Sequence, residues 1–400
     1  MCPACAETYR WDAYHLIAAG LRGGKGVPDS VTAHPATFLT LTPPSFGTVH
    51  TRLDRTGRPG AGRSRLGPCR PRRDRPACPH GRPMSCGVVH GDGDKRTGTP
   101  LCLDCYDHAA QVAWNAFVPK LWTRTIDAVK RELRRLSRAH GGTAARIRYA
   151  KVAEFQARGA VHLHALVRLD GADPNDPDAV VAPPSWATAE LLNGLLVDAA
   201  RSTAIRTPPH PDMPDGWVVQ WGEQVRPLSV ARGLPGAEVT EQHVAGYLAK
   251  YATKATEPAG HLSARLTAST VRIYTDPAKH TGRLVSAAWE LGRPEAGDGW
   301  SRLRPWAHML GFGGHFATKS RTYSTSFGAL RAARSTAMRR ANATAAHAEQ
   351  ASDEETETVL VVGSWTYAGT GWRTTADAAL ALAAADAARQ RRPAAADPAA

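Results

Sequence analysis

Polar and apolar residues alternate along two neighbouring stretches of the chain, residues 146–156 and 160–169. Alternation with a period of two is typical of half-buried β-strands. Residues 157–159, Ala-Arg-Gly, separate the two stretches, and a three-residue loop with glycine in it is a common hairpin connection. The pattern therefore predicts a β-hairpin, in which the length of the loop places Glu154 opposite His162.

The rest of the hydrophobic pattern predicts both helices and strands. Residues 37–42 alternate β-branched and apolar side chains before two prolines, which favours a strand. An amphipathic helix is predicted over residues 107–138, where Pro119 should kink the helix or split it in two. Further predicted elements are helices over residues 9–21, 186–201 and 240–254 and a strand over residues 217–225.

Glu154, His162 and His164 should converge on one face of the predicted hairpin. Directly opposed side chains lie about 4.5–5.5 Å apart at Cβ, and a diagonal neighbour such as His164 is still within reach. Two imidazoles and one carboxylate form a candidate site for a divalent metal. The simpler alternative is a pair of exposed histidines on a strand, and the hairpin alone leaves both open.

The chain of 400 residues is strongly basic, with 50 Lys and Arg against 36 Asp and Glu and a formal net charge of +14. This balance favours a polyanionic partner, most simply nucleic acid, although GC-rich coding also enriches arginine. Seven unevenly spaced cysteines without a signal peptide argue against a secreted disulfide framework. No stretch is apolar enough to span a bilayer, so we expect a cytoplasmic protein without a membrane partner.

Residues 45–100 lack regular periodicity and are dominated by arginine, glycine and proline. A segment with so few apolar residues needs a metal to fold, and Cys-X-X-Cys with two upstream cysteines is typical of a zinc ribbon or treble clef. The predicted ligands of a structural Zn²⁺ are Cys78, Cys86, Cys102 and Cys105. Because the spacing of the first pair is wide, His80 or Cys69 could replace one ligand. Near the N-terminus, Cys2 and Cys5 are either half of another metal site or two reduced thiols.

The predicted helix over residues 240–254 carries two tyrosines, Tyr247 and Tyr251. Residues four apart share one helix face, and Lys250 follows Tyr247 by three residues, which is also within reach. Core packing explains one such tyrosine. Two tyrosines, each followed three residues later by a lysine, favour a chemical role.

Three short motifs in this order resemble those of the HUH endonucleases. They are Phe38-Leu-Thr-Leu-Thr42, His162-Leu-His164 and Tyr247-Leu-Ala-Lys250. More narrowly, residues 9–330 are similar to rolling-circle replication initiators of actinomycete plasmids, and the paired tyrosines are similar to those of two-tyrosine phage initiators. Conjugative relaxases of this class place the tyrosine before the histidines, whereas here it follows them. The resemblance implies an α+β fold whose antiparallel sheet has ferredoxin-like order, with the zinc segment inserted.

The resemblance also implies a mechanism. Tyr247 would attack a phosphodiester of single-stranded or cruciform origin DNA, giving a 5′-phosphotyrosyl link and a free 3′-hydroxyl, and later rejoining would use the stored bond energy. His162, His164 and Glu154 would hold Mn²⁺ or Mg²⁺, which acts on the scissile phosphate as a Lewis acid.

Two further groups and one partner complete the expected reaction. Lys250 could favour the phenolate form of the nucleophile electrostatically. Tyr251 would be either a second nucleophile for termination or a core residue. A host helicase is the expected protein partner.

The motifs divide the chain into five expected regions. These are residues 1–44 with the first helix and strand, 45–106 with the zinc segment, 107–257 with the nuclease core, 258–335 as an extension, and 336–400 as a hairpin and a partly disordered alanine-rich tail. Two other functions are compatible with the sequence. One is a two-tyrosine HUH transposase, and the other is a non-catalytic, zinc-dependent DNA-binding repressor with inert histidines.

Overall fold

The computed structural model describes residues 3–54, 66–70, 77–91, 93–230, 245–249 and 265–349. The helices are α1 (Pro3–Arg22), α2 (His108–Ala139), α3 (Ala189–Ser202), α5 (His280–Leu291) and α6 (Phe327–Glu349), with short 3-10 helices η1 (Asp29–Ala33), η3 (Val271–Ile273), η4 (Pro294–Ala296) and η5 (Arg304–Met309). The strands are β1 (Ala36–Leu41), β2 (Leu53–Asp54), β3 (Leu66–Gly67), β4 (Ala145–Phe155), β5 (Val161–Gly171), β6 (Ala204–Arg206), β7 (Val218–Gln220), β8 (Val225–Ser229) and β9 (Ala317–Lys319). Within the described ranges, no helix has the length and apolar character needed to cross a membrane.

A five-stranded sheet with the order β8-β1-β5-β4-β9 forms the centre of the molecule, and every neighbouring pair is antiparallel. Strand β5 is the middle strand and pairs with β1 on one side and β4 on the other. Along the chain the main elements follow one another as β1, α2, β4, β5, α3 and β8. The predicted α+β class with an antiparallel sheet is confirmed.

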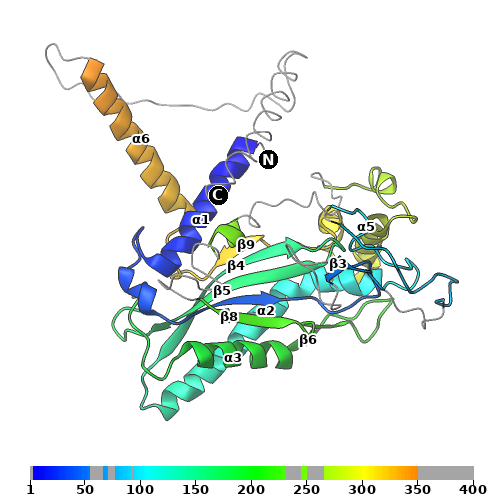
Figure 1. The fold of residues 1–400 in the computed structure, drawn as a ribbon, viewed down its shortest axis with the longest axis horizontal. Helices are drawn as coiled ribbons and strands as arrows, with labels where there is room; N and C mark the ends of the chain where they lie inside the picture. The colour runs from blue at the N-terminus through cyan, green and yellow to red at the C-terminus, as the bar shows by residue number, and fades with distance from the viewer. Residues whose placement is uncertain are drawn as a thin grey trace.

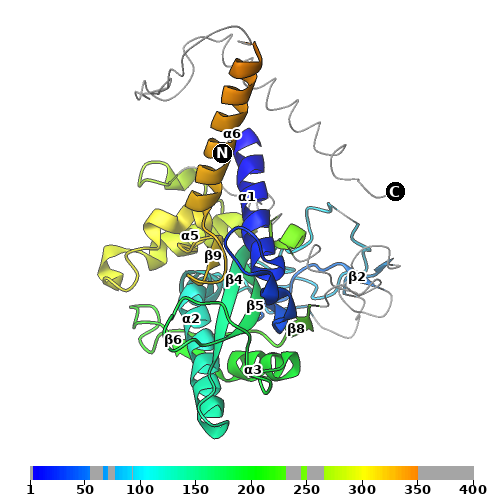
Figure 2. The ribbon, with the colours of Figure 1, turned by 90° about the vertical axis from the view of Figure 1, so that its left-hand side faces the viewer.

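Different helices cover the two faces of the sheet. Figures 1 and 2 show α2 and α3 along one face and α1 on the opposite face, while α6 extends away from the body. Because side chains alternate along a strand, β5 contributes Leu163 to the core beneath α2 and Leu166 to the core beneath α1. Leu248, from the described helical residues 245–249, belongs to this second core.

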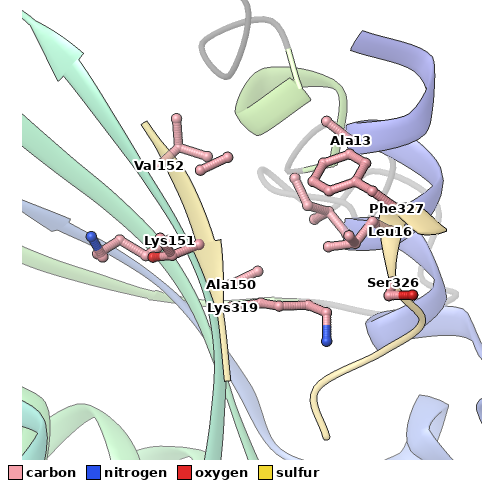
Figure 3. A pocket seen from close by; sticks show the side chains of 11 residues that line it. Ala13, Leu16, Ala150, Lys151, Val152, Lys319, Ser326 and Phe327 are labelled. Carbon is pink, nitrogen blue, oxygen red and sulfur yellow. The ribbon is translucent and has the colours of Figure 1, made fainter. Parts of the chain in front are cut away.

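A cavity of about 200 Å³ lies where α1 and the start of α6 meet the edge of the sheet. Figure 3 shows Leu16 and Phe327 facing Val152 across this space. The amine of Lys151 points to the other face of the sheet, where it lies 5.9 Å from the centre of the Trp122 ring. Apolar side chains dominate the lining, so this cavity is a gap in the packing and is poorly suited to bind phosphate.

The long predicted helix is confirmed as α2. Its N-cap is Asp107, whose side chain accepts a hydrogen bond from the backbone N–H of Ala110 at 2.8 Å. The helix is not split, because it continues through Pro119 as one element. The predictions over residues 350–400 lie outside the described residues.

The single strand predicted over residues 217–225 is wrong. Strand β7 pairs with β6 in a separate two-stranded sheet, and β8, farther along the chain, is one edge strand of the main sheet. The cause lies at Gly222, whose backbone N–H donates to the carbonyl of Thr42 at 2.8 Å. A Cβ at this position would lie 2.6 Å from the carbonyl oxygen of Pro43, so the chain passes too closely to continue a regular strand.

A buried carboxylate joins β5 to the segments that cover its end. Asp170 accepts hydrogen bonds from the guanidinium of Arg168 at 2.6 and 2.7 Å and lies 2.7 Å from Nδ1 of His34. Arg168 also donates to the carbonyl of Gly20 at the end of α1. Burial raises the pKa of Asp170, but the hydrogen bonds from His34 and Arg168 outweigh burial and hold the pKa below its ordinary value.

Asp170→Asn is expected to lower the free energy of unfolding by about 3–5 kcal/mol, because it leaves the buried guanidinium of Arg168 without its counter-charge. In the wild type this stabilisation should be present above the unfolded pKa of about 3.9 and lost as the pH falls through the lower folded value. Urea unfolding at several pH values measures both effects. Asp178→Asn is the matched control, since Asp178 pairs with Arg321 at the surface and should cost less than about 1 kcal/mol. Equal losses in the two variants would contradict the central role of Asp170.

Candidate active site and metal centres

The hairpin of β4 and β5 has the predicted register, with Glu154 directly opposite His162. The backbone N–H of Gln156 donates to the carbonyl of Ala160 at 2.9 Å and closes the turn. Gly159 has a φ of 74°, which lies in the left-handed region that glycine adopts without steric cost. The geometry of this turn fixes the register of β4 and β5, and the register places Glu154 and His162 on the same face of the sheet.

The ligand atoms of Glu154, His162 and His164 all lie within 4.8 Å of one another. Oε2 of Glu154 is 3.4 Å from Nε2 of His164. Within the described part of the chain, Nε2 of His162 is buried and has no hydrogen-bond partner. Burial, with the charges of His164 and Arg158, lowers the pKa of His162 to about 3, so the imidazole stays neutral, which is the form that binds metal. This donor set fits a divalent cation.

Two residues of β1 position His164, and the sequence did not assign them a role. Strand pairing places Thr40 opposite His164, and Oγ1 of Thr40 lies 3.2 Å from Nδ1 of the imidazole. A hydrogen bond there leaves Nε2 for Glu154 or a metal. The Phe38 ring stacks on the imidazole with centroids 5.7 Å apart and planes 3° apart. Alternation along β1 puts Phe38 and Thr40 on one face, which is the signal that could have identified them.

Tyr247 lies against this cluster. Its hydroxyl is 3.4 Å from Nε2 of His164, and its ring meets those of His164 and Phe38 edge-on at 5.0 and 5.7 Å. The residue is 39% exposed, so part of Tyr247 lies at the surface. The structure thus brings one of the two predicted tyrosines to the histidines. Tyr251 and Lys250 lie outside the described residues.

Helix α2 anchors the turn of the hairpin. The side-chain amide of Asn115 donates to the carbonyl of Gly159 at 3.0 Å, and its oxygen accepts from the backbone N–H of Val161 at 2.9 Å. Gln111 donates to the carbonyl of Arg158 at 2.9 Å. These buried side chains hold the turn that sets the positions of Glu154 and His162.

Residues 45–106, here called the cysteine segment, contain two clusters of metal-ligating side chains, in each of which the ligand atoms lie within 4.8 Å of one another. The Cys78 cluster consists of Cys78, His80, Cys102 and Cys105, and the His50 cluster consists of His50, Cys69, Cys86 and His90. The predicted grouping of Cys86 with Cys78, Cys102 and Cys105 is therefore wrong, and His80 takes the fourth place. The reason is a backbone bridge between Arg70 and Cys86, which holds Cys86 beside Cys69.

The Cys78 cluster is built on a tight turn. The backbone N–H of Gly81 donates to the carbonyl of Cys78 at 2.8 Å, and this turn brings Nδ1 of His80 to 3.2 Å from Sγ of Cys105 and 3.7 Å from Sγ of Cys102. Desolvation raises the pKa of the Cys78 thiol, but backbone N–H groups and the neighbouring thiols lower it to about 6. A thiolate is the form of cysteine that binds metal.

A groove of about 940 Å³ opens beside the hairpin turn, between the cysteine segment and α5. Arg52 and Lys95 from the cysteine segment, Arg158 from the turn and Lys279 before α5 line it. Arg158 stays close to the hairpin, since its guanidinium donates to the side chain of Gln156 at 2.9 Å. Cations from three parts of the fold therefore border one groove at the hairpin turn.

A family model described as "Replication initiator protein, pSAM2" (RepSA) matches residues 1–386. The chain belongs to the RepSA family. A replication initiator protein of Streptomyces ambofaciens is 42% identical over 380 residues, which cover 92% of this chain and 74% of that protein. No solved structure matches the chain. The expectation of a replication initiator is confirmed at the level of the family, and tyrosine-dependent nicking stays a prediction for this RepSA protein.

Asn115→Ala is expected to lower the free energy of unfolding of this RepSA protein by about 2–4 kcal/mol, because it leaves buried backbone groups of the hairpin turn unpaired. Chemical denaturation measures the change. The control is Asn175→Ala on an exposed loop, for which a change within about 0.5 kcal/mol is expected. A loss at Asn115 no larger than that of the control would show that α2 does not hold the turn.

Proposed function

We propose that this RepSA-family protein nicks one strand of its replication origin with Tyr247 and rejoins the strand at termination of rolling-circle replication. The observation that carries the proposal is the position of the Tyr247 hydroxyl, 3.4 Å from Nε2 of His164 on the sheet face that also holds Glu154 and His162. A phenol beside two imidazoles and a carboxylate is an arrangement suited to metal-assisted attack on a phosphodiester.

The topology supports this assignment. Strands β1, β4, β5 and β8 with helices α2 and α3 follow the strand-helix-strand-strand-helix-strand order of a ferredoxin-like fold. This is the order that the resemblance to HUH endonucleases implies. The candidate ligands lie on the central strand β5 and its neighbour β4, where both flanking strands restrain them.

The proposed reaction is a transesterification. The phenol oxygen of Tyr247 forms a bond to the 5′-phosphate, the bond from phosphorus to the 3′-oxygen breaks, and the phenol proton ends on the released 3′-hydroxyl. A free phenol has a pKa of about 10, so the charge of Lys250, three residues farther along, would favour the reactive phenolate. Mn²⁺ or Mg²⁺ held by Glu154, His162 and His164 would supply Lewis-acid stabilisation of the phosphate.

The basic groove beside the hairpin turn is the proposed path for the DNA strand. Arg52, Lys95, Arg158 and Lys279 would contact backbone phosphates, in keeping with the formal net charge of +14. A single-stranded or cruciform origin would give such a groove access to an unpaired strand. Tyr251 is the proposed second nucleophile for termination, and a host helicase is the proposed partner in strand separation.

The Cys78 cluster is proposed to bind a structural Zn²⁺. Three thiols and one imidazole form a Cys₃His set, which is common in closed structural zinc sites. The cluster lies in the segment that borders the DNA groove. Zinc there would hold the groove in shape and take no part in the chemistry.

Tyr247→Phe is expected to abolish the covalent adduct between the protein and labelled single-stranded origin DNA in the presence of Mn²⁺. His162→Ala with His164→Ala should also abolish nicking, while binding to origin DNA changes little because phosphate contacts elsewhere supply most of the affinity. Adduct formation by denaturing electrophoresis and binding by gel shift separate the two effects. Tyr274→Phe, outside the cluster, should form the adduct as the wild type does. A wild-type protein that binds origin DNA without forming an adduct would favour the non-catalytic repressor.

Thr40→Val is expected to raise the Mn²⁺ concentration needed for half-maximal nicking by about 10–100-fold, because it removes the group that orients His164 while keeping the shape of the side chain. The nicking rate is measured over a Mn²⁺ titration. Thr42→Val is the matched control, since the Thr42 hydroxyl bonds to the carbonyl of Gln224 and not to an imidazole. If both variants titrate as the wild type does, Thr40 has no part in metal binding.

A further inference from the structure

The His50 cluster gathers two thiols and two imidazoles from well-separated positions of the cysteine segment. Nδ1 of His50 lies 3.2 Å from Nε2 of His90. Sγ of Cys86 is 3.7 Å from Nε2 of His90, and Sγ of Cys69 is 3.9 Å from Nδ1 of His50. Each of the four residues thus directs one ligand atom toward a common centre.

These separations match the edges of a tetrahedral zinc site. Bond lengths of about 2.0–2.1 Å to nitrogen and about 2.3 Å to sulfur put two nitrogens about 3.4 Å apart and a nitrogen and a sulfur about 3.6 Å apart. The distance of 3.2 Å between the nitrogens of His50 and His90 and the distances of 3.7 and 3.9 Å from nitrogen to sulfur lie close to these values.

Outer contacts orient two of the four side chains. Nδ1 of His90 lies 2.8 Å from Oδ2 of Asp94, so its other nitrogen faces the cluster. A carboxylate on the far nitrogen of a histidine is a recurring feature of zinc sites. On the sulfur side, the backbone N–H of Thr51 donates to Sγ of Cys69 at 3.1 Å.

Burial without a metal would be costly for these groups. Cys69 and His90 are 0% and 1% exposed. The hydrophobic clusters of the described residues include only Phe46 from residues 45–106, so the described part of the segment contributes little to the apolar core. Cys69 and Cys86 are free thiols, so no disulfide links them. A bound metal would add folding energy that apolar packing of these residues does not supply.

We infer that the His50 cluster is a second zinc site, with Cys₂His₂ ligation, distinct from the Cys₃His site at Cys78. A metal at this site would fix the part of the segment that contacts the turn of the β4–β5 hairpin. The backbone of His50 donates to the carbonyl of Thr99 and accepts from the N–H of Gly98, both at 2.8 Å. A Cβ on Gly98 would lie 2.6 Å from the backbone of Ala157, so this part of the segment packs directly on the turn of the β4–β5 hairpin.

The proposal is tested by counting zinc in the full-length protein. All variants carry His162→Ala and His164→Ala, so that the hairpin contributes no metal. We expect two zinc ions per chain, measured by mass spectrometry of the metal content after desalting. Cys69→Ser with Cys86→Ser should remove one ion, and Cys102→Ser with Cys105→Ser should remove the other. Cys2→Ser with Cys5→Ser is the control that should keep both.

Asp94→Asn keeps the test decisive if the double cysteine variants do not fold. This variant retains all four ligands, and we expect one of its two zinc ions to bind about 10–100-fold more weakly to the protein in competition with a chelator. Asp178→Asn is the matched surface control and should hold both ions as the background does. A zinc count that is the same with and without Cys69→Ser and Cys86→Ser, or unchanged affinity in Asp94→Asn, would overturn the second site. Because metal is counted and not nicking, the result is independent of the role of Tyr247.

Discussion

Antiparallel pairing of β5 with both β1 and β4 is the constraint on which the candidate site depends. The hairpin register brings Glu154 opposite His162, and the pairing with β1 brings Thr40 opposite His164. A shift of either pairing by one residue would turn every side chain of that strand to the other face of the sheet. The backbone ladder therefore decides whether a carboxylate, two imidazoles and a hydroxyl meet at one point.

The two faces of this sheet have different physical characters. Beneath α2 and α3 the face is packed with aliphatic and aromatic side chains, which form the largest hydrophobic cluster of the described residues. On the opposite face, polar groups occur near both ends of β5, with the histidines at one end and Arg168 and Asp170 at the other. The opposite face thus combines the core beneath α1 with polar groups in fixed positions.

The described part of the cysteine segment contributes little to the apolar core, yet it lies close to this site. Five cysteines and three histidines form two compact clusters. The backbone of His50 accepts a hydrogen bond from Gly98, and Gly98 contacts the hairpin turn. From the other side, Asn115 of α2 contacts the same turn. Arg158, at the centre of this turn, is held between the two supports and lines the basic groove.

Local patterns in the sequence determined the elements that depend on neighbouring residues. Alternation and the glycine-containing loop were sufficient for the β4–β5 hairpin and its register, and the amphipathic stripe was sufficient for α2. The motifs and the basic charge also pointed to a replication initiator, which the family match confirms. The hairpin and α2 could be predicted because each depends on interactions between residues that are close together in the sequence.

Only the tertiary structure decided what depends on long-range contacts. The sorting of Cys86 away from Cys78 requires the backbone bridge to Arg70, and no spacing rule contains that bridge. The contact of Tyr247 with His164 joins residues 83 positions apart in the chain. Phe38 and Thr40 acquire their positions beside His164 only because β1, and not another strand, pairs with β5. Strand partners and ligand partners are chosen by the packing of the whole chain, since the burial that favours one pairing comes from helices that the local sequence does not include.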